Sequence, residues 1–309
     1  MVALQDADYV LAKLDWTRDN GIWPNGLRYL WTDAFGVVLL VSLYEALGDD
    51  EYIGNAEWVV SEVDRVLGRR RGIRIGEEED RDGQYFHYLA MWLYALAVLG
   101  RHIPSYRNKG VELVHQIHDA FVIRGRGVIW KMQEDLSGPY PGYGLGALDA
   151  FDGYVSYRLL DEAALEREIE DMHAIMERQV PSLVVTQDLG IGMMLWMSHF
   201  FPGEGWARVQ RRRCLDMLDQ MWMPDGYFCR EPSLPHVKFA FTNYGVSVGL
   251  QAVGTMGDRV ERLNDFFERY RSGDEYDRAA ITHVMACSSH FPGALLDGGL
   301  APHSERRSG

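Results

Sequence analysis

The stretch that decides the fold is RYLWTDAFGVVLLVSLYEALG, residues 28–48. Its second half is apolar on almost every face, a pattern typical of a helix that is buried on most sides. Yet Asp33 lies near the entrance of this helix, beside Trp31 and Phe35. A carboxylate in such surroundings caps a helix, binds a ligand or takes part in catalysis.

The composition indicates a globular protein that does not bind nucleic acid. The chain has 309 residues, of which 47% are hydrophobic, and its net charge is −14. That acidity argues against nucleic acid as a partner. Cys214, Cys229 and Cys287 are too scattered for a disulfide framework or a metal pair, which indicates a reducing compartment. Since no signal peptide or long uncharged apolar run is visible, we expect a cytoplasmic protein with no membrane partner.

Two kinds of predicted helix alternate along the chain. Six are amphipathic, with one apolar stripe, and cover residues 7–21, 52–70, 109–121, 165–179, 206–222 and 259–273. Six are apolar on nearly all faces and cover residues 33–48, 85–100, 147–160, 188–201, 243–256 and 279–291. Glycine and proline turns separate them, and short strands are expected only around 127–133 and 225–231.

This alternation predicts six helical hairpins that close into a ring, with the apolar helices inside. The alternative is an open helical solenoid, which usually has a constant period of roughly 34 to 47 residues. The apolar helices begin near residues 33, 85, 149, 188, 243 and 283, at uneven intervals that favour the closed toroid. We expect a single domain over residues 1–300 and a disordered tail over residues 301–309.

The acidic theme at Asp33 recurs at other apolar helices. An Asp or Asn followed by apolar residues and glycine returns at Asp188 and Asn243, and Asp149 and Asp152 head a further helix. Inner helices of a toroid run in one direction, so these residues are predicted to meet at one mouth. Asp and Asn are also favoured N-caps, which leaves a purely structural explanation open. Asp149 and Asp152 are three residues apart on one helix face, where two carboxylates raise each other's pKa.

With these features the chain resembles the six-hairpin glycosidase superfamily, the (α/α)6 toroids. The helix alternation, the acid-headed inner helices and the nearby aromatic residues carry the resemblance. The superfamily includes glycoside hydrolases, unsaturated-uronide hydrolases, sugar epimerases and lyases, and a few relatives of the fold act on terpene alcohols. The resemblance therefore implies an all-α toroid with a carbohydrate-active site, without selecting a reaction.

Glycoside hydrolysis is the reaction predicted first, since it needs one protonated and one ionised carboxyl group. We predict Asp149 and Asp33 as the acid and base, with Asp188 and Asp152 next. Aromatic and polar neighbours are expected to contact a small-molecule or oligosaccharide substrate. These predicted lining residues are Trp31, Tyr85, His87, Tyr143, Glu231, Asn243, Tyr244 and His283.

Two other functions stay open. His87 and His283 would shuttle protons in a sugar epimerase or isomerase, a lyase, or a small-molecule isomerase or dehydratase. A toroid that binds a ligand without catalysis is the third possibility. No metal is predicted, because the His115 and His118 pair falls on an outer helix, and no glycine patch has dinucleotide-binding spacing, so no cofactor is expected. The oligomeric state is left open, a homo-oligomer included.

Overall fold

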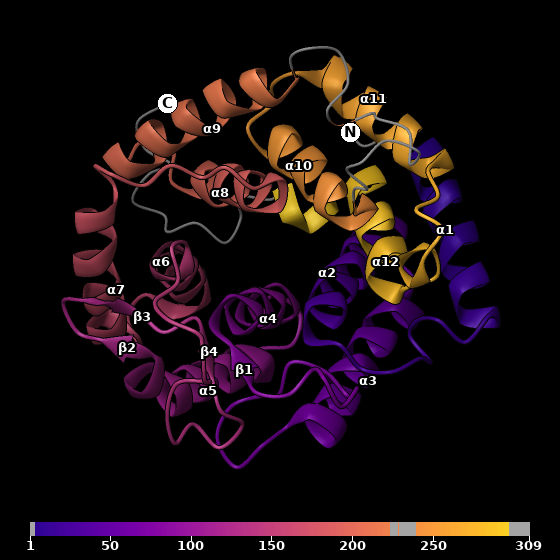
Figure 1. The fold of residues 1–309 in the computed structure, drawn as a ribbon. Coiled ribbons are helices and arrows are strands. Elements are labelled where there is room, and N and C mark those ends of the chain that lie inside the picture. Colours follow the sequence, from indigo (N-terminus) through magenta and orange to yellow (C-terminus); the bar gives the residue numbers. More distant parts are fainter. Residues whose placement is uncertain (1–3, 223–227, 229–238, 297–309) are drawn as a thin grey trace. The chain divides into compact units, whose positions relative to one another are not determined.

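A computed structural model of the chain describes residues 4–222, 228 and 239–296 (Figure 1). The tail predicted at 301–309 lies outside the described residues. So do Glu231 and, apart from Phe228, the strand predicted around 225–231.

Helices dominate the described residues, which confirms the all-α class predicted from the sequence. The twelve α-helices are α1 (Leu4–Asp19), α2 (Leu30–Leu47), α3 (Asp50–Leu67), α4 (Phe86–Leu99), α5 (Ser105–Phe121), α6 (Asp149–Asp161), α7 (Glu166–Gln179), α8 (Asp188–Phe200), α9 (Gly205–Trp222), α10 (Ala240–Ala252), α11 (Gly257–Arg269) and α12 (Ala280–His290). Two short 3-10 helices, η1 (Glu275–Asp277) and η2 (Gly293–Leu296), flank α12.

The chain divides into two compact units, and each is described by itself. The middle unit comprises residues 27–183, and the terminal unit comprises residues 4–26 together with the described residues of 184–296. The expectation of one domain over residues 1–300 stays a prediction.

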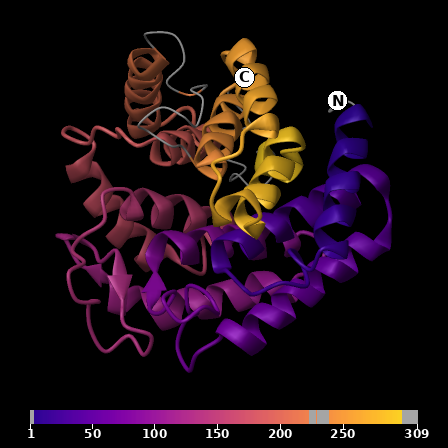
Figure 2. The ribbon, with the colours of Figure 1, turned by 45° about the vertical axis from the view of Figure 1, so that its right-hand side comes forward.

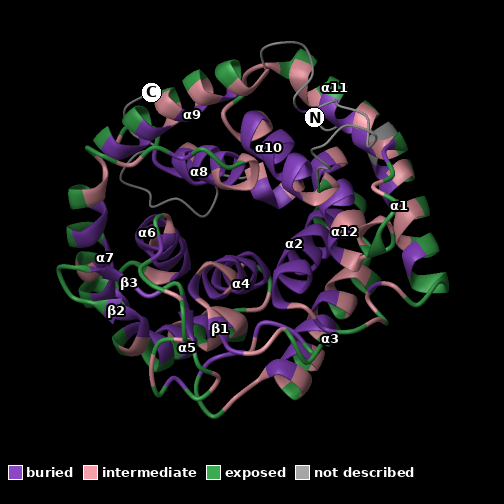
Figure 3. Cartoon of the chain, viewed as in Figure 1, coloured by how far each residue is buried: buried purple, intermediate pink, exposed green. Residues whose placement is uncertain are grey.

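Three helical hairpins form the middle unit. Helix α2 packs on α3, α4 on α5 and α6 on α7, while α2 also packs on α4, and α4 on α6 (Figure 2). The inner helices α2, α4 and α6 are largely buried, and the outer helices bury one stripe only (Figure 3). On α3 that stripe includes Val59, Val63 and Leu67, as the amphipathic pattern predicts.

Two small antiparallel ladders lie beside the middle helices. Strand β1 (Gln84–Tyr85) pairs with β4 (Lys131–Met132), and β2 (Val122–Ile123) pairs with β3 (Gly127–Val128). The buried side chain of Gln84 accepts a hydrogen bond from the backbone of Ile73 at 3.0 Å and donates one to the carbonyl of Glu134 at 2.7 Å. These bonds fix the chain just before α4 and so position the first residues of that helix.

The described part of the terminal unit contains two hairpins and one pair of helices from opposite ends of the chain. Helix α12 packs on α1, α8 on α9 and α10 on α11, while α10 also packs on α8 and α12. Two glycines let α8 and α10 approach closely: a Cβ on Gly192 would lie 2.3 Å from the carbonyl oxygen of Gly245, and one on Gly249 would lie 2.3 Å from that of Gly192. Only a residue without a side chain fits at either position.

Helix α2 is the one helix of the described chain that has the length and composition needed to cross a membrane. Of its 18 residues, 78% are buried inside the protein. Such burial is typical of a core helix, which is apolar on all faces for the same reason as a membrane span.

Candidate active site

The entrance of α6 carries two buried carboxyl groups. Asp149 is the first residue of α6 and is 4% exposed, and Asp152 is 5% exposed. The N-cap of this helix is Leu148, so neither acid occupies the capping position. Oδ1 of Asp149 is buried without a hydrogen-bond partner among the described residues. A buried polar atom of this kind is costly, and this cost calls for a functional explanation.

The surroundings of Asp149 favour its neutral form. Burial raises the pKa of Asp149, and the negative charge of Asp152 raises it further. His87 and hydrogen bonds from backbone N–H groups act in the opposite direction, and the resulting pKa is about 8. Asp149 is therefore protonated at neutral pH and has a proton to donate.

A glycine makes room for the Asp149 carboxyl group. A Cβ on Gly146 would lie 1.6 Å from Oδ2 of Asp149, so no other residue fits at position 146 with the carboxyl group in place. The backbone N–H of Gly146 donates to the carbonyl of Val128 at 2.9 Å and fixes this part of the loop to β3. The sequence places Gly146 in a glycine-rich loop, but its contact with Asp149 was not predicted.

His87 and Asp152 form a hydrogen-bonded pair between α4 and α6. Nδ1 of His87 lies 2.7 Å from Oδ2 of Asp152. Burial alone lowers the pKa of His87, but the charge of Asp152 and its hydrogen bond outweigh burial and raise it. Because Asp152 bonds to Nδ1, Nε2 is the ring nitrogen that remains for a substrate group. The buried ring of Trp31 stacks on the imidazole at 4.7 Å and 27° and restricts its rotation.

Aromatic side chains extend from this pair toward the surface. Tyr88 contacts both Trp31 and Tyr85, with ring centroids 5.2 Å apart in each case. Tyr85 stacks on Trp130 at 5.6 Å and 12°, and its hydroxyl lies 3.5 Å from that of Tyr143. Trp130 is 45% exposed. The predicted lining residues Tyr85 and Tyr143 therefore belong to a partly exposed aromatic surface that continues to His87.

A charged pair supports the aromatic surface. The ammonium of Lys131 lies 3.8 Å from the centre of the Tyr140 ring and 3.3 Å from Oδ1 of Asp82. The hydroxyl of Tyr140 donates to Oδ2 of Asp82 at 2.7 Å. Burial alone raises the pKa of Asp82, but these two donors lower it, so Asp82 is an ionised anchor for the loop.

Asp33 has a different environment from Asp149. Its Oδ1 accepts a hydrogen bond from Nη1 of Arg28 at 2.9 Å, and its Oδ2 accepts one from the backbone N–H of Tyr29 at 3.2 Å. Both charged side chains are buried, with exposed fractions of 4% for Arg28 and 1% for Asp33. The carboxylate therefore ties the segment before α2 to the helix. Its predicted catalytic role stays a prediction, and its contacts are those of a structural ion pair.

In the terminal unit, Asp188 connects the first turns of α8 and α10. Its Oδ1 accepts from the backbone N–H of Leu189 at 2.8 Å, and its Oδ2 accepts from the hydroxyl of Thr242 at 2.7 Å and from Nδ2 of Asn243 at 3.4 Å. Asn243 is fully buried and also donates to the carbonyl of Phe239 at 2.9 Å. The Thr242 contact was missed at the sequence level, although Thr242 directly precedes Asn243.

The structure thus distributes the predicted site residues over several groups. Asp149, Asp152, His87 and Trp31 lie together, and Tyr85 and Tyr143 continue that cluster. Asp188 and Asn243 form a second group, and Tyr244 and His283 line a pocket of the terminal unit. A single mouth that contains all of them would need residues from both units, and it stays a prediction. Glu231 lies outside the described residues.

Cys214 and Cys287 are both buried. Burial raises the pKa of the Cys214 and Cys287 thiols to about 12, so neither is a thiolate at neutral pH. No group of three or more His, Cys, Asp or Glu side chains in the described part of the chain is placed to hold a metal ion.

Comparison with known proteins identifies the fold and nothing finer. No protein-family model and no curated protein sequence matches the chain. Among solved structures, cellobiose 2-epimerase from Spirochaeta thermophila DSM 6192 is 13% identical, with a TM-score of 0.59 over 87% of this chain and 86% of that one. A D-mannose isomerase is 10% identical, with a TM-score of 0.60 over 87% of this chain and 88% of that one.

A glycoside hydrolase has the same fold. It is the α-1,6-mannanase GH76A of Salegentibacter sp. HEL1_6, studied as an inactive variant with two adjacent aspartates changed to asparagine and with α-1,6-mannotriose bound. This protein is 10% identical, with a TM-score of 0.62 over 94% of this chain and 99% of that one. These similarities confirm the predicted six-hairpin (α/α)6 toroid fold. At such low identity they do not determine the reaction.

Proposed function

We propose that the chain is a carbohydrate-active enzyme that isomerises or epimerises a reducing sugar by proton transfer. One observation carries the proposal: the buried carboxyl group of Asp149, whose pKa burial raises to about 8, lies in the same cluster as His87, whose Nδ1 lies 2.7 Å from Asp152. This arrangement supplies a general acid and an oriented general base.

The proposed reaction begins with the open-chain carbonyl form of the sugar. Nε2 of His87 removes the proton from the carbon beside the carbonyl, and the electron pair of that C–H bond forms a carbon–carbon double bond. The carbonyl oxygen takes the proton of Asp149, which gives an enediol. If the enediol turns about the single bond to the rest of the sugar, the opposite face of the same carbon meets His87. Return of the proton from Nε2 to that face, with the enediol hydroxyl proton passing back to Asp149, restores the carbonyl and gives the epimer. Return to the former carbonyl carbon, with a hydroxyl proton passing back to Asp149, gives the isomer.

Asp152 has a supporting role in this scheme. Its carboxylate accepts the Nδ1–H of His87 and stabilises the imidazolium that forms when Nε2 gains the proton. Trp31 limits the ring to one orientation. An acid and base of this kind are each worth roughly 10²- to 10⁴-fold in rate.

The fold neighbours and the placement of the acids support isomerisation over the mannanase reaction. Two of the structures with this fold are a sugar epimerase and a sugar isomerase. The mannanase was inactivated at two adjacent aspartates. In this chain consecutive aspartates occur once, at Asp49 and Asp50, where Asp49 caps the outer helix α3 through the backbone N–H of Glu51 at 2.9 Å.

Hydrolysis of a glycoside is the second candidate. The raised pKa of Asp149 favours it, because a glycosidase needs a protonated carboxylic acid. The nearest carboxylate in sequence, Asp152, lies three residues along the same helix face, whereas glycosidase carboxyl groups flank the bond that is cleaved. Asp33, predicted as the partner acid, is already paired with Arg28. The geometry therefore supports proton transfer within one cluster better than attack from two sides.

Solvent exchange distinguishes the two reactions. Wild-type protein would be incubated in D2O with reducing aldoses and disaccharides, among them glucose, mannose and cellobiose, and the products followed by NMR. Proton transfer predicts deuterium at the carbon beside the carbonyl and a new sugar, and Asp149→Asn slows both by roughly 10²-fold or more. Cleavage of aryl glycosides or disaccharides without deuterium uptake would support hydrolysis instead. Absence of any exchange with all these sugars would contradict the proposal.

A further inference from the structure

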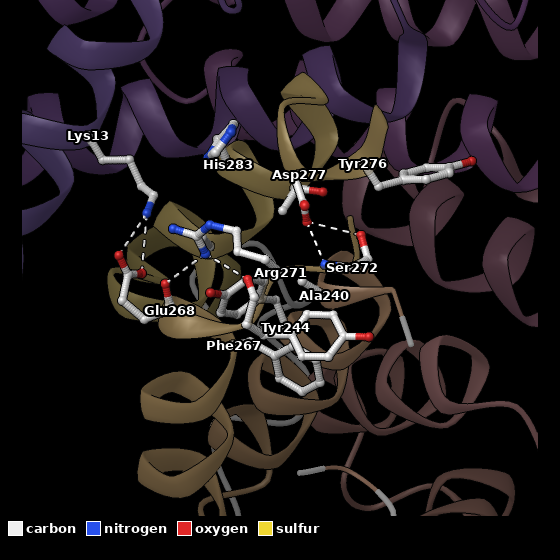
Figure 4. Close-up of a pocket in the computed structure, with 13 residues that line it drawn as sticks. Lys13, Ala240, Tyr244, Phe267, Glu268, Arg271, Ser272, Tyr276, Asp277 and His283 are labelled. Atoms are coloured by element: carbon white, nitrogen blue, oxygen red, sulfur yellow. Dashed lines mark hydrogen bonds and ion pairs between the residues drawn. The ribbon is translucent and has the colours of Figure 1, made fainter. Parts of the chain in front are cut away.

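A pocket of the terminal unit has an uneven distribution of charge (Figure 4). It is lined by residues from α1, α10, α11, α12 and the segment between α11 and α12, among them Lys13, Tyr244, Glu268, Arg271, Thr282 and His283. The groups used in the proposed reaction, Asp149, Asp152 and His87, do not belong to it.

Most of the charge in this pocket is already neutralised. The ammonium of Lys13 lies 3.1 Å from Oε1 and 3.2 Å from Oε2 of Glu268, and the hydroxyl of Tyr9 also donates to that carboxylate. Asp277 accepts hydrogen bonds from the backbone N–H groups of Ser272 and Gly273, at 2.7 and 2.8 Å. Both acids of the pocket are therefore occupied by donors within the protein.

Arg271 is the pocket cation that keeps donors available. Its Nη1 donates to the backbone carbonyls of Glu268 at 3.1 Å and Tyr270 at 2.6 Å, which fixes the guanidinium. Its Nε and Nη2 groups have no hydrogen-bond acceptor among the described residues. Figure 4 shows the guanidinium pointing toward the side of the pocket that carries Lys13 and His283. Arg271 is an exposed side chain, and the N–H groups that these two bonds leave over have the geometry to pair with a carboxylate at the edge of the pocket.

Two neighbouring polar atoms are buried without partners. They are Nε2 of His283 and the hydroxyl oxygen of Thr282, neither of which has a hydrogen bond within the described part of the chain. Burial and the charges of Lys13 and Arg271 lower the pKa of His283 to about 4, so the imidazole is neutral. A backbone hydrogen bond of Asp277 to the imidazole acts in the opposite direction and raises this pKa. A neutral imidazole has one nitrogen that accepts and one that donates, so the unpartnered Nε2 suits a hydroxyl group, which does both.

We propose that this pocket binds a small hydroxycarboxylate, such as a hydroxy acid or a sugar acid. The carboxylate pairs with the free N–H groups of Arg271, and a hydroxyl of the ligand donates to Nε2 of His283. Trp16, whose ring meets that of His283 edge-on at 4.9 Å, keeps the imidazole in place. This inference is independent of the proposed function, because it uses other residues and concerns binding alone.

The hydroxyl contact is tested with ligands that differ by that group only. Binding of L-lactate and propionate would be measured by NMR through the imidazole signals of His283, with inorganic phosphate as a second anion. A neutral hydrogen bond predicts that lactate binds roughly 3- to 10-fold more tightly than propionate. Equal affinity of the two, or phosphate binding as tightly as lactate, would overturn the assignment, and so would the absence of lactate binding.

The carboxylate contact is tested with two arginines of equal charge. Arg269 is an exposed residue of α11 that does not line the pocket, so Arg269→Gln is the matched control for Arg271→Gln. Loss of the charged contact predicts about 10-fold or more weaker lactate binding in Arg271→Gln, with little change in the control. Circular dichroism verifies that both variants are folded. Equal lactate affinities in the two folded variants would refute the role of Arg271.

Discussion

Asp149 and Asp188 occupy the same position in two inner helices, but their carboxyl groups have different surroundings. Each is the first residue of an apolar helix, α6 in the middle unit and α8 in the terminal unit. The carboxylate of Asp188 accepts hydrogen bonds from Leu189, Thr242 and Asn243. Oδ1 of Asp149 has no partner among the described residues, and burial raises the pKa of this group to about 8.

The adjacent inner helix creates this difference. Helix α10 brings the hydroxyl of Thr242 and the amide of Asn243 to Asp188, and these donors suit an ionised carboxylate. Helix α4 brings His87, which pairs with Asp152 and leaves Asp149 to be buried beside a second negative charge. An acid at a helix start thus becomes a structural brace or a candidate proton donor according to what its neighbour contributes.

Asp33 is a third acid near the start of an inner helix, and its replacement is expected to cause the largest loss of stability. Asp33→Ala leaves Arg28 buried without its carboxylate, and breaking a buried ion pair costs about 3–5 kcal/mol. Urea denaturation measures the free energy of unfolding. The double variant Arg28→Met/Asp33→Leu removes both charges and is expected to recover much of the loss. A single-variant cost below about 1 kcal/mol, the value for an exposed pair, would contradict the ion-pair account.

Asp149→Asn gives the largest expected loss of activity. Asparagine keeps the shape of the protonated acid but does not deliver its proton, so deuterium exchange should fall by roughly 10²-fold or more. Asp188→Asn is the matched control, because its oxygen still accepts the Thr242 hydrogen bond, and its activity should change little. Equal losses of deuterium exchange in the two variants would contradict the assignment of Asp149 as proton donor and Asp188 as a structural residue.

The free energy of unfolding is expected to depend on pH differently in wild-type protein and in Asp149→Asn. Folded Asp149 holds its proton more tightly than the unfolded chain does, so its contribution is full below the ordinary aspartate pKa of about 3.9 and is lost as the pH rises toward about 8. Wild-type stability should therefore fall relative to Asp149→Asn by at least about 1.4 kcal/mol over this interval. Urea denaturation at a series of pH values tests this, and parallel stability curves for the two proteins would contradict it.

Asp188→Ala is expected to have the smallest effect. The change leaves Thr242 and Asn243 without one acceptor, although both still donate to the carbonyl of Phe239. The expected cost is about 1 kcal/mol, the usual worth of such a hydrogen bond or helix-start contact. Thermal unfolding measures it, with Asp188→Asn as the milder reference. A loss as large as that of Asp33→Ala would mean that Asp188 has a role beyond bracing α8 and α10.

The sequence predicted the helices well because burial alone determines their patterns. All twelve were identified from apolar stripes and apolar runs, and α6 and α8 begin close to the residues expected. The predicted starts of α2 and α10 were three residues late, so Asp33 lies in the second half of the first turn and not at the entrance. The two-residue strands β1 and β2 were missed, since two residues are too few to show a period.

The candidate site was predictable as residue types and not as contacts. Asp149, Asp152 and His87 were recognised as ionisable groups at inner-helix entrances. Their pairing was not, because it depends on how α4 and α6 pack. Gly146 beneath Asp149 and Arg28 beside Asp33 were missed for the same reason. Arg28 lies only five residues before Asp33, so a search for a charge partner within one helical turn or two would have found it.

The protonation state of Asp149 tests the account most directly. The carbon signals of ¹³C-labelled aspartate carboxyl groups would be followed from acidic to alkaline pH, and the Asp149 signal identified by its absence in Asp149→Asn. The account predicts a carboxyl group that is still protonated at neutral pH and ionises with a midpoint of about 8. An Asp149 signal that titrates near the ordinary aspartate pKa of about 3.9 would contradict it.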